Sequence, residues 1–249
     1  MIVAVNTGRK GSKGFPGKNT FDVMGEPLAY YSTKSALDTP EIDRVYMSTN
    51  SIPLMKMSEE MDVEIIKRPE ELCSDEAKSA DVFLHALDII ESRIKPHRVE
   101  LIVLLMANAF CITPEKLSEG INFLKENQEY DSAITVSKYN MWNPVRARKI
   151  VNNKLEPYVP FQYIPCGKVS SDRTDQIDCW FADMGASIVR PRCLRNVRSG
   201  MMPQPWMGNV IYPLKQEAGF DVDYEWQIPL AEYWLKKYGG YNDKRKRTT

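Results

Sequence analysis

The sequence has few histidines and no clustered cysteines. His85 and His97 are its only histidines, so a Ser-His-Asp or Cys-His nucleophilic mechanism has few residues to draw on. The five cysteines are widely spaced and form no Cys-x-x-Cys pair. This pattern favours reduced thiols over a disulfide framework or a zinc site. His85 falls within an apolar helical pattern, and we interpret it as a packing or capping residue.

Long apolar runs and an excess of one charge are also missing. The longest apolar run, residues 101–107, is far shorter than the ~20 residues of a membrane helix. Only a few apolar residues precede the first charged loop, which does not fit a signal peptide. Basic and acidic residues balance at 33 each, so bulk attraction to nucleic acid or an acidic membrane is not indicated. We expect a soluble cytoplasmic protein with no nucleic-acid or membrane partner.

The chain does contain a regular alternation of short apolar segments and amphipathic helical patterns. Strands are expected at residues 2–5, 44–48, 63–66, 99–106, 131–137, 182–189 and 210–212, and helices at 27–37, 79–94, from 114 onward and at 224–238. This order predicts an α/β fold with a mostly parallel sheet covered on both faces, in one domain spanning residues 1–249. Residues 147–157 are predicted to form a hairpin around Asn152-Asn153. We interpret residues 138–178 as a functional insertion or a dimer arm.

A basic, glycine-rich loop follows the first strand. Glycine recurs at positions 8, 11, 14 and 17, with Arg9, Lys10, Lys13 and Lys18 between them. Glycines allow sharp turns and a close approach of the backbone to a ligand, and exposed N–H groups beside basic side chains favour a polyphosphate. The loop is not a Walker motif, because Gly17-Lys18 is followed by Asn19. We expect it to bind a nucleoside triphosphate at the carboxyl edge of the sheet. The alternative is a flexible basic surface loop.

Two further segments carry chemistry. Asp221 and Asp223 alternate along an extended stretch, so both carboxylates can reach one hard cation such as Mg²⁺. The alternative is an acidic helix N-terminus. Residues 67–79 lie between a predicted strand and a predicted helix, and Arg68 with small hydroxyl residues there could recognise a base edge. A charged surface connection is the alternative for that segment.

Taken together, these segments resemble the motif set of the acylneuraminate (CMP-sialic acid) cytidylyltransferases. The motifs are Arg9-x-Gly11-Ser12-Lys13-Gly14-x-Pro16-x-Lys18-Asn19, then Ser48-Thr49, then Arg68-Pro69-Glu70-Glu71-Leu72 with Ser74-Asp75, then Asp221-Val222-Asp223 and Ala231-Glu232. They occur in the family's order over nearly the whole chain. The resemblance implies a three-layer α/β/α Rossmann-like nucleotidyltransferase with an inserted dimerisation or acceptor region. It also implies a homodimer that uses CTP and Mg²⁺.

The resemblance assigns roles by position. The implied triphosphate-binding loop comprises Gly8, Arg9, Gly11, Ser12, Lys13 and Lys18, and Asn19 is implied to contact ribose and phosphate. The residues implied to recognise cytosine are Arg68, Ala77 and Ser79. The residues implied to bind magnesium are Asp221 and Asp223. Among these, Arg9, Lys18 and Asp223 are implied to act in catalysis. An acceptor oxygen attacks the α-phosphate of CTP and pyrophosphate leaves. Such a step depends on positioning and charge neutralisation, and the scarcity of histidine agrees with it.

The acceptor half departs from the family pattern. Where the family has Gln-Pro-Thr-Ser-Pro-Leu-Arg, residues 106–112 read Met-Ala-Asn-Ala-Phe-Cys-Ile, and Asn-Gly-Ala-Ile-Tyr has become Met184-Gly185-Ala186-Ser187-Ile188. The expected acceptor-binding residues are Met106, Asn108, Arg173 and Ile188. A site that hydrogen-bonds its substrate loses much when its polar groups are replaced. We expect a small acidic acceptor, either a sialic-acid-like nonulosonic acid or a small phosphonate.

Two other functions remain open. A glycosyltransferase could use Asp-x-Asp with a nucleotide sugar, although the triphosphate-type loop argues against it. A degenerate regulator would bind CTP without turnover, although Lys18 and both aspartates are retained. Core packing is the expected role of Trp206 and Trp226, with the acceptor pocket or a subunit contact as the alternative.

Overall fold

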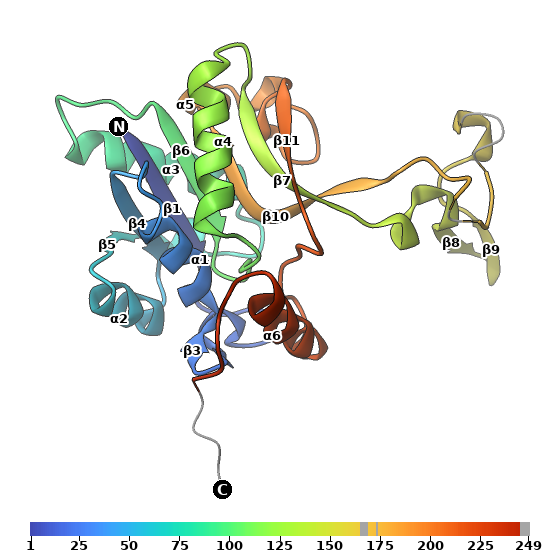
Figure 1. Cartoon of the computed structure of the whole chain (residues 1–249), viewed down its shortest axis with the longest axis horizontal. Helices are drawn as coiled ribbons and strands as arrows, with labels where there is room; N and C mark the ends of the chain where they lie inside the picture. The colour runs from blue at the N-terminus through green and yellow to red at the C-terminus, as the bar shows by residue number, and fades with distance from the viewer. Residues whose placement is uncertain (165–168, 173, 245–249) are drawn as a thin grey trace, which may run out of the picture.

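A seven-stranded sheet organises the computed structural model, which describes residues 1–164, 169–172 and 174–244 (Figure 1). The strand order is β11-β7-β10-β6-β1-β4-β5. The strands are β1 (Ile2–Gly8), β4 (Arg44–Thr49), β5 (Glu64–Lys67), β6 (Leu101–Met106), β7 (Ser132–Lys138), β10 (Trp180–Val189) and β11 (Ile211–Gln216). All neighbours run parallel except β10, which is antiparallel to β6 and β7. The predicted mostly parallel sheet is confirmed.

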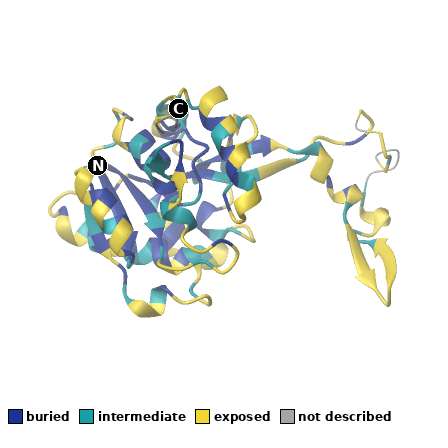
Figure 2. Ribbon diagram, turned by 90° about the horizontal axis from the view of Figure 1, so that it is seen from below, coloured by how far each residue is buried: buried dark blue, intermediate teal, exposed yellow. Residues whose placement is uncertain are grey.

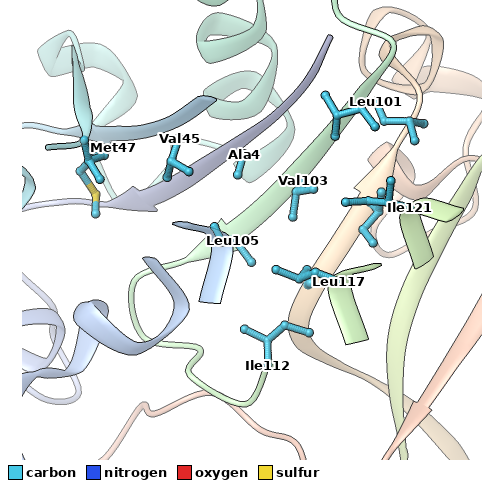
Figure 3. Packing of buried hydrophobic residues seen from close by; sticks show 14 of the residues in the cluster. Ala4, Val45, Met47, Leu101, Val103, Leu105, Ile112, Leu117 and Ile121 are labelled. Carbon is cyan, nitrogen blue, oxygen red and sulfur yellow. The ribbon is translucent and has the colours of Figure 1, made fainter. Parts of the chain in front are cut away.

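Helices cover both faces of this sheet. They are α1 (Leu28–Leu37), α2 (Ile52–Glu60), α3 (Ser79–Arg93), α4 (Pro114–Glu126), α5 (Pro191–Arg195) and α6 (Ile228–Lys237). Alternate residues of β1 point to opposite faces, as strand geometry requires. Ala4 joins a buried cluster with α1, α2 and α4, part of which is drawn in Figure 3, whereas Val5 joins a second cluster with α3 and α5. The three-layer α/β/α arrangement follows.

Helix α6 packs against elements from the first 40 residues of the chain. A third buried cluster joins α6 to α1 and to the short hairpin formed by β2 (Asp22–Val23) and β3 (Glu26–Pro27). Trp234 of α6 meets Phe110 with ring centroids 5.9 Å apart. The predicted helix at 224–238 starts with a 3-10 turn, Glu225–Gln227, before α6 begins. This packing brings residues 219–223 next to the glycine loop.

The described residues between 139 and 179 form an arm that extends away from the body (Figures 1 and 2). It carries β8 (Arg148–Val151) and β9 (Lys154–Pro157), which pair as the predicted hairpin. Asn152 and Asn153 both have positive φ, the conformation that a two-residue hairpin turn requires. Ile150 and Leu155 are paired across the hairpin and are 76% and 72% exposed. Within the described residues, no helix has the length and apolar character needed to cross a membrane.

Candidate active site

A cavity of about 220 Å³ lies at the carboxyl ends of β1 and β6. This edge of a parallel sheet is where such folds bind ligands. Eleven of the residues expected from the sequence line it: Gly8, Arg9, Gly11, Ser12, Lys18, Asn19, Arg68, Ala77, Ser79, Met106 and Asn108. The fold therefore collects three separate sequence motifs around one cavity.

Asp75 bridges two cations of the glycine loop. Its Oδ1 lies 2.5 Å from Arg9 Nη2, and its Oδ2 lies 2.5 Å from Lys13 Nζ. Arg9 also donates through Nη1 to the Cys73 carbonyl at 3.0 Å. Hydrogen bonds from Lys13 and then Arg9 lower the pKa of Asp75. Asp75 lines the cavity but was not among the expected site residues.

Lys18 connects the glycine loop (residues 8–19) to residues 219–223, called the acidic segment below. Its Nζ donates to Asp223 Oδ1 at 2.6 Å, and the Lys18 side chain is only 12% exposed. Gly14 lies close to the same segment, because a Cβ at Gly14 would sit 2.9 Å from the Asp223 carbonyl oxygen. The segment before α6 thus packs directly against the loop after β1.

The two aspartates differ in environment. Val222 between them is fully buried, as the alternation predicts, and Asp223 is largely exposed. Asp221 Oδ2 accepts from Asn108 Nδ2 at 3.1 Å, which ties it to the cavity floor after β6. Burial, followed by the nearby charge of Asp223, raises the pKa of Asp221. A buried carboxylate close to a second carboxylate is stabilised by a cation between them.

The acidic pair fits a magnesium ion that also binds phosphate. Mg²⁺ prefers oxygen ligands and is commonly held by one or two carboxylates together with substrate phosphates. The described residues contain no cluster of three or more His, Cys, Asp or Glu side chains that could hold a metal by themselves. Asp221 and Asp223 therefore suit a metal that arrives with a nucleotide better than a metal enclosed by protein ligands.

Arg68 also lines the cavity. Its side chain is buried, and Nη2 donates to the Ser48 carbonyl at 2.8 Å. Its Nε–H is buried and has no partner within the described part of the protein. Burial is the main cause that lowers the pKa of Arg68. Buried donors are normally paired, so this group is an exception, and Arg68 lines the cavity together with Ala77 and Ser79.

The expected acceptor residues are only partly brought together. Met106, at the end of β6, and Asn108 line the cavity. Ile188 does not: it is fully buried in the cluster beneath α4, where its Cδ1 closely approaches Gly120. The expected acceptor contact of Ile188 is therefore wrong, because β10 turns this side chain into the core. Arg173 lies outside the described residues.

The two tryptophans differ in their burial. Trp206 is buried and meets Phe83 edge to face at 5.4 Å, so its expected packing role is confirmed. Phe83 in turn lines the cavity. Trp226 is 67% exposed beside Tyr224, so core packing is wrong for this residue.

Comparison with known proteins identifies relatives of the chain. Residues 4–155 match the family described as Cytidylyltransferase. N-acylneuraminate cytidylyltransferase from Oncorhynchus mykiss is 24% identical over 240 residues, and N-acylneuraminate cytidylyltransferase A from Danio rerio is 30% identical over 239 residues. Each alignment covers 96% of this chain and 51% of the relative. The chain therefore spans about half the length of these relatives.

Solved structures share the fold at low sequence identity. CMP:2-keto-3-deoxy-manno-octonic acid synthetase complexed with CTP superimposes with a TM-score of 0.66 at 13% identity, covering 94% of this chain and 98% of that one. 4-Diphosphocytidyl-2C-methyl-D-erythritol synthase from Anaerococcus prevotii gives 0.60 at 12% identity, covering 95% and 96%.

Proposed function

Because this chain belongs to the cytidylyltransferase family of nucleotidyltransferase enzymes, we propose that it transfers CMP from CTP to an oxygen of a small acidic acceptor. The new bond joins the acceptor oxygen to the α-phosphorus. The bond from the α-phosphorus to the oxygen bridging to the β-phosphate breaks, pyrophosphate leaves, and the acceptor loses a proton if its oxygen carries one. The observation that carries this proposal is that the glycine loop and Arg68 line one cavity, while the acidic pair contacts two of its lining residues, Lys18 and Asn108.

The charged side chains have distinct parts in this reaction. Arg9, Lys13 and Lys18 neutralise the triphosphate, exchanging their present carboxylate partners for phosphate oxygens. Asp221 and Asp223 would hold Mg²⁺, which when bound supplies positive charge beside the phosphates. Arg68, which lines the cavity with Ala77 and Ser79, would contact the base. No covalent enzyme intermediate is needed.

The acceptor is either a sialic-acid-like nonulosonic acid or a small phosphonate. The acidic-sugar acceptor is supported by relatives named for neuraminate and, in Campylobacter jejuni, pseudaminic acid, the latter 25% identical over 61% of this chain and 63% of its own length. A small phosphonate is the second candidate because Met106 presents no polar group to a sugar hydroxyl. Phe83 lines the cavity too, and Met184 packs on the same cluster as Met106. Thioether and aromatic groups offer few hydrogen bonds to a sugar's hydroxyl groups.

The deciding experiment measures pyrophosphate release from each of the four nucleoside triphosphates with Mg²⁺, across nonulosonic acids and small phosphonates. Release with CTP and one acceptor class is the expected result. CTP binding without release from any acceptor would favour the regulator. Neither binding nor release would overturn the proposal.

We also propose that the protein is a cytoplasmic homodimer that associates through the arm. Exposed apolar residues on the hairpin support the association, and the described cysteines are free thiols, which suits a reducing compartment. Light scattering should give twice the chain mass. Replacing Ile150 and Leu155 together by serine should give a monomer, whereas Lys149→Gln on the same hairpin should not. A monomeric wild-type protein would contradict the dimer.

A further inference from the structure

Asp183 is a buried carboxylate that the proposed reaction does not use. It lies in β10 at an irregularity where the pairing with β7 shifts between Ala182 and Ser187. Its side chain is buried, and no described lysine or arginine forms an ion pair with it. Burying a carboxylate without a cation is costly unless hydrogen bonds replace the lost water. The position therefore needs an explanation.

Hydrogen-bond donors from three strands surround Asp183. Ser137, near the end of β7, donates its hydroxyl to Oδ2 at 2.6 Å. Gln216, at the end of β11, donates Nε2 to the same oxygen at 3.0 Å. The backbone N–H of Gly185 donates to Oδ1 at 3.1 Å. Asp183 thus ties the end of β11, which the acidic segment follows, to β7 and β10.

The Ser137 hydroxyl links Asp183 to the acidic segment through two hydrogen bonds. A hydroxyl has one hydrogen, and the shorter of its two acceptor contacts, 2.6 Å to Asp183 Oδ2 against 3.3 Å to the Gln216 carbonyl, directs it to the carboxyl group. Its oxygen is then left as an acceptor, and the Gly219 N–H donates to it at 2.8 Å. The Gly219 carbonyl accepts a hydrogen bond from the Tyr139 hydroxyl at 3.0 Å, so both the N–H and the carbonyl of Gly219 have partners.

Gly219 also fits closely against Asp183 itself. A Cβ at Gly219 would overlap the Asp183 carboxylate, so only glycine brings the backbone this near. Asp221 follows two residues later and is held at its other side by Asn108. The acidic segment is therefore fixed at one end by the Asp183 network and at the other by the loop after β6.

We propose that Asp183 is a positioning residue that sets the geometry of the metal-binding aspartates through Ser137 and Gly219. This inference rests on the proposed role of Asp221 and Asp223 in holding Mg²⁺. Residues that orient metal ligands typically change metal affinity 10–100-fold when they are replaced. Because Asp183 acts through two intervening groups, we expect about a tenfold effect, at the lower end of that range.

The other end of β7 supplies matched controls. Asp131 accepts the backbone N–H groups of Asn209 and Val210 at 2.9 and 3.1 Å, where β11 begins. Ser132 donates to the Met207 carbonyl at 2.5 Å. Asp131 and Ser132 are thus an aspartate and a serine that also form hydrogen bonds to neighbouring strands and loops, but they lie at the amino end of β7, away from the cavity, and Asp131 additionally pairs with Arg192 at 3.0 Å.

The test measures Mn²⁺ binding to the whole protein by electron paramagnetic resonance, with saturating CTP and no acceptor. Asp183→Asn and Ser137→Ala should each raise the Mn²⁺ Kd about tenfold. The Kd of CTP without metal should change less than about twofold, because the glycine loop and Arg68 are untouched. Asp131→Asn and Ser132→Ala should leave the Mn²⁺ Kd within about twofold, even where they lower the Tm.

The outcomes separate this inference from the function on which it rests. Wild-type Mn²⁺ affinity in both Asp183→Asn and Ser137→Ala would overturn the positioning role while leaving the metal assignment intact. Equal losses in the control variants would also overturn it, because the effect would then reflect general destabilisation. Absence of CTP-dependent Mn²⁺ binding in the wild type would overturn the metal assignment itself, and the positioning role with it. If Asp183→Asn fails to fold, Ser137→Ala decides alone.

Discussion

Lys18 and Asp223 are 205 positions apart in the chain, yet the Lys18 ammonium donates to the Asp223 carboxylate across 2.6 Å. The contact joins the loop after β1 to the segment that leads into α6. A triphosphate that attracts Lys18 competes with Asp223 for its ammonium. Nucleotide binding and the state of the acidic pair are therefore linked through this one contact.

Replacing Lys18 by alanine should impair CTP use without unfolding the protein. Loss of a positive charge from a preorganised site typically lowers turnover by about 10²–10³. The partner Asp223 is largely exposed, so the ion pair should contribute little to stability. Steady-state kinetics and a thermal melt test this, with Lys56→Ala on the exposed face of α2 as the charge-matched control. Wild-type kinetics in Lys18→Ala would remove the loop from the catalytic account.

Asp223→Asn should lower turnover and weaken its dependence on magnesium. The amide keeps the shape of the side chain but removes the charge that a hard cation requires. We expect a loss of at least about tenfold at limiting Mg²⁺, partly recovered at high Mg²⁺. Glu225→Gln, an exposed change two residues away, should behave as the wild type. An unaltered magnesium titration in Asp223→Asn would exclude it as a ligand.

The raised pKa of Asp221 predicts opposite pH effects on binding and folding. Metal binding needs the carboxylate, so affinity should fall as the pH drops through a range above that of an ordinary aspartate. For folding, a pKa that is higher in the folded than in the unfolded state lowers the free energy of unfolding once the pH is high enough to ionise the carboxyl group. Asp221→Asn should therefore raise the Tm of the metal-free protein near pH 7, with the gain disappearing at acidic pH.

Asp131 provides the contrast for that experiment. Hydrogen bonds from Asn209, Val210 and Arg192 outweigh its burial and lower its pKa. Its contribution to stability is present above the unfolded-state pKa and is lost as the pH falls through the folded-state value. Asp131→Asn should therefore lower the Tm near pH 7. A fall in Tm for Asp221→Asn as well would contradict the account of Asp221.

Gly14→Ala should disturb the junction between the glycine loop and the acidic segment. The new Cβ would lie 2.9 Å from the Asp223 carbonyl oxygen, a backbone atom that cannot simply rotate away. Small displacements of positioning groups reduce catalysis strongly, so we expect the KM for CTP to rise about tenfold or more. Gly239→Ala, which crowds the Leu235 carbonyl at 3.0 Å away from the cavity, should affect the Tm alone. An unchanged KM in Gly14→Ala would show that this contact is dispensable.

Local patterns in the sequence predicted most elements, because strands and helices carry their own periodicity. The hairpin at Asn152-Asn153 and the start of α4 at Thr113-Pro114 are confirmed for that reason, since turn and cap chemistry is local. The 3-10 turn before α6 was not expected. It depends on Gln227, whose side chain accepts the backbone N–H of Asp223.

The parts of the site that sequence reasoning missed depend on contacts between distant segments. Asp75 meets Arg9 across 66 positions, and Asp183 meets Ser137 across 46. No spacing rule connects such residues, because the sheet topology brings them together. Ile188 was expected at the site because its position matches a family motif, but the motif does not say to which face of the sheet its side chain points. In β10 that side chain points into the core.

Arg9, Lys13 and Lys18 are all paired with carboxylates of the protein, Asp75 and Asp223. An entering anion must displace carboxylates that already occupy these cations, so its gain is a difference between two sets of contacts. A ligand with several adjacent negative charges offers more oxygens to these cations than a ligand with one phosphate. Binding at this edge of the sheet should therefore depend on the number of adjacent negative charges that the ligand carries.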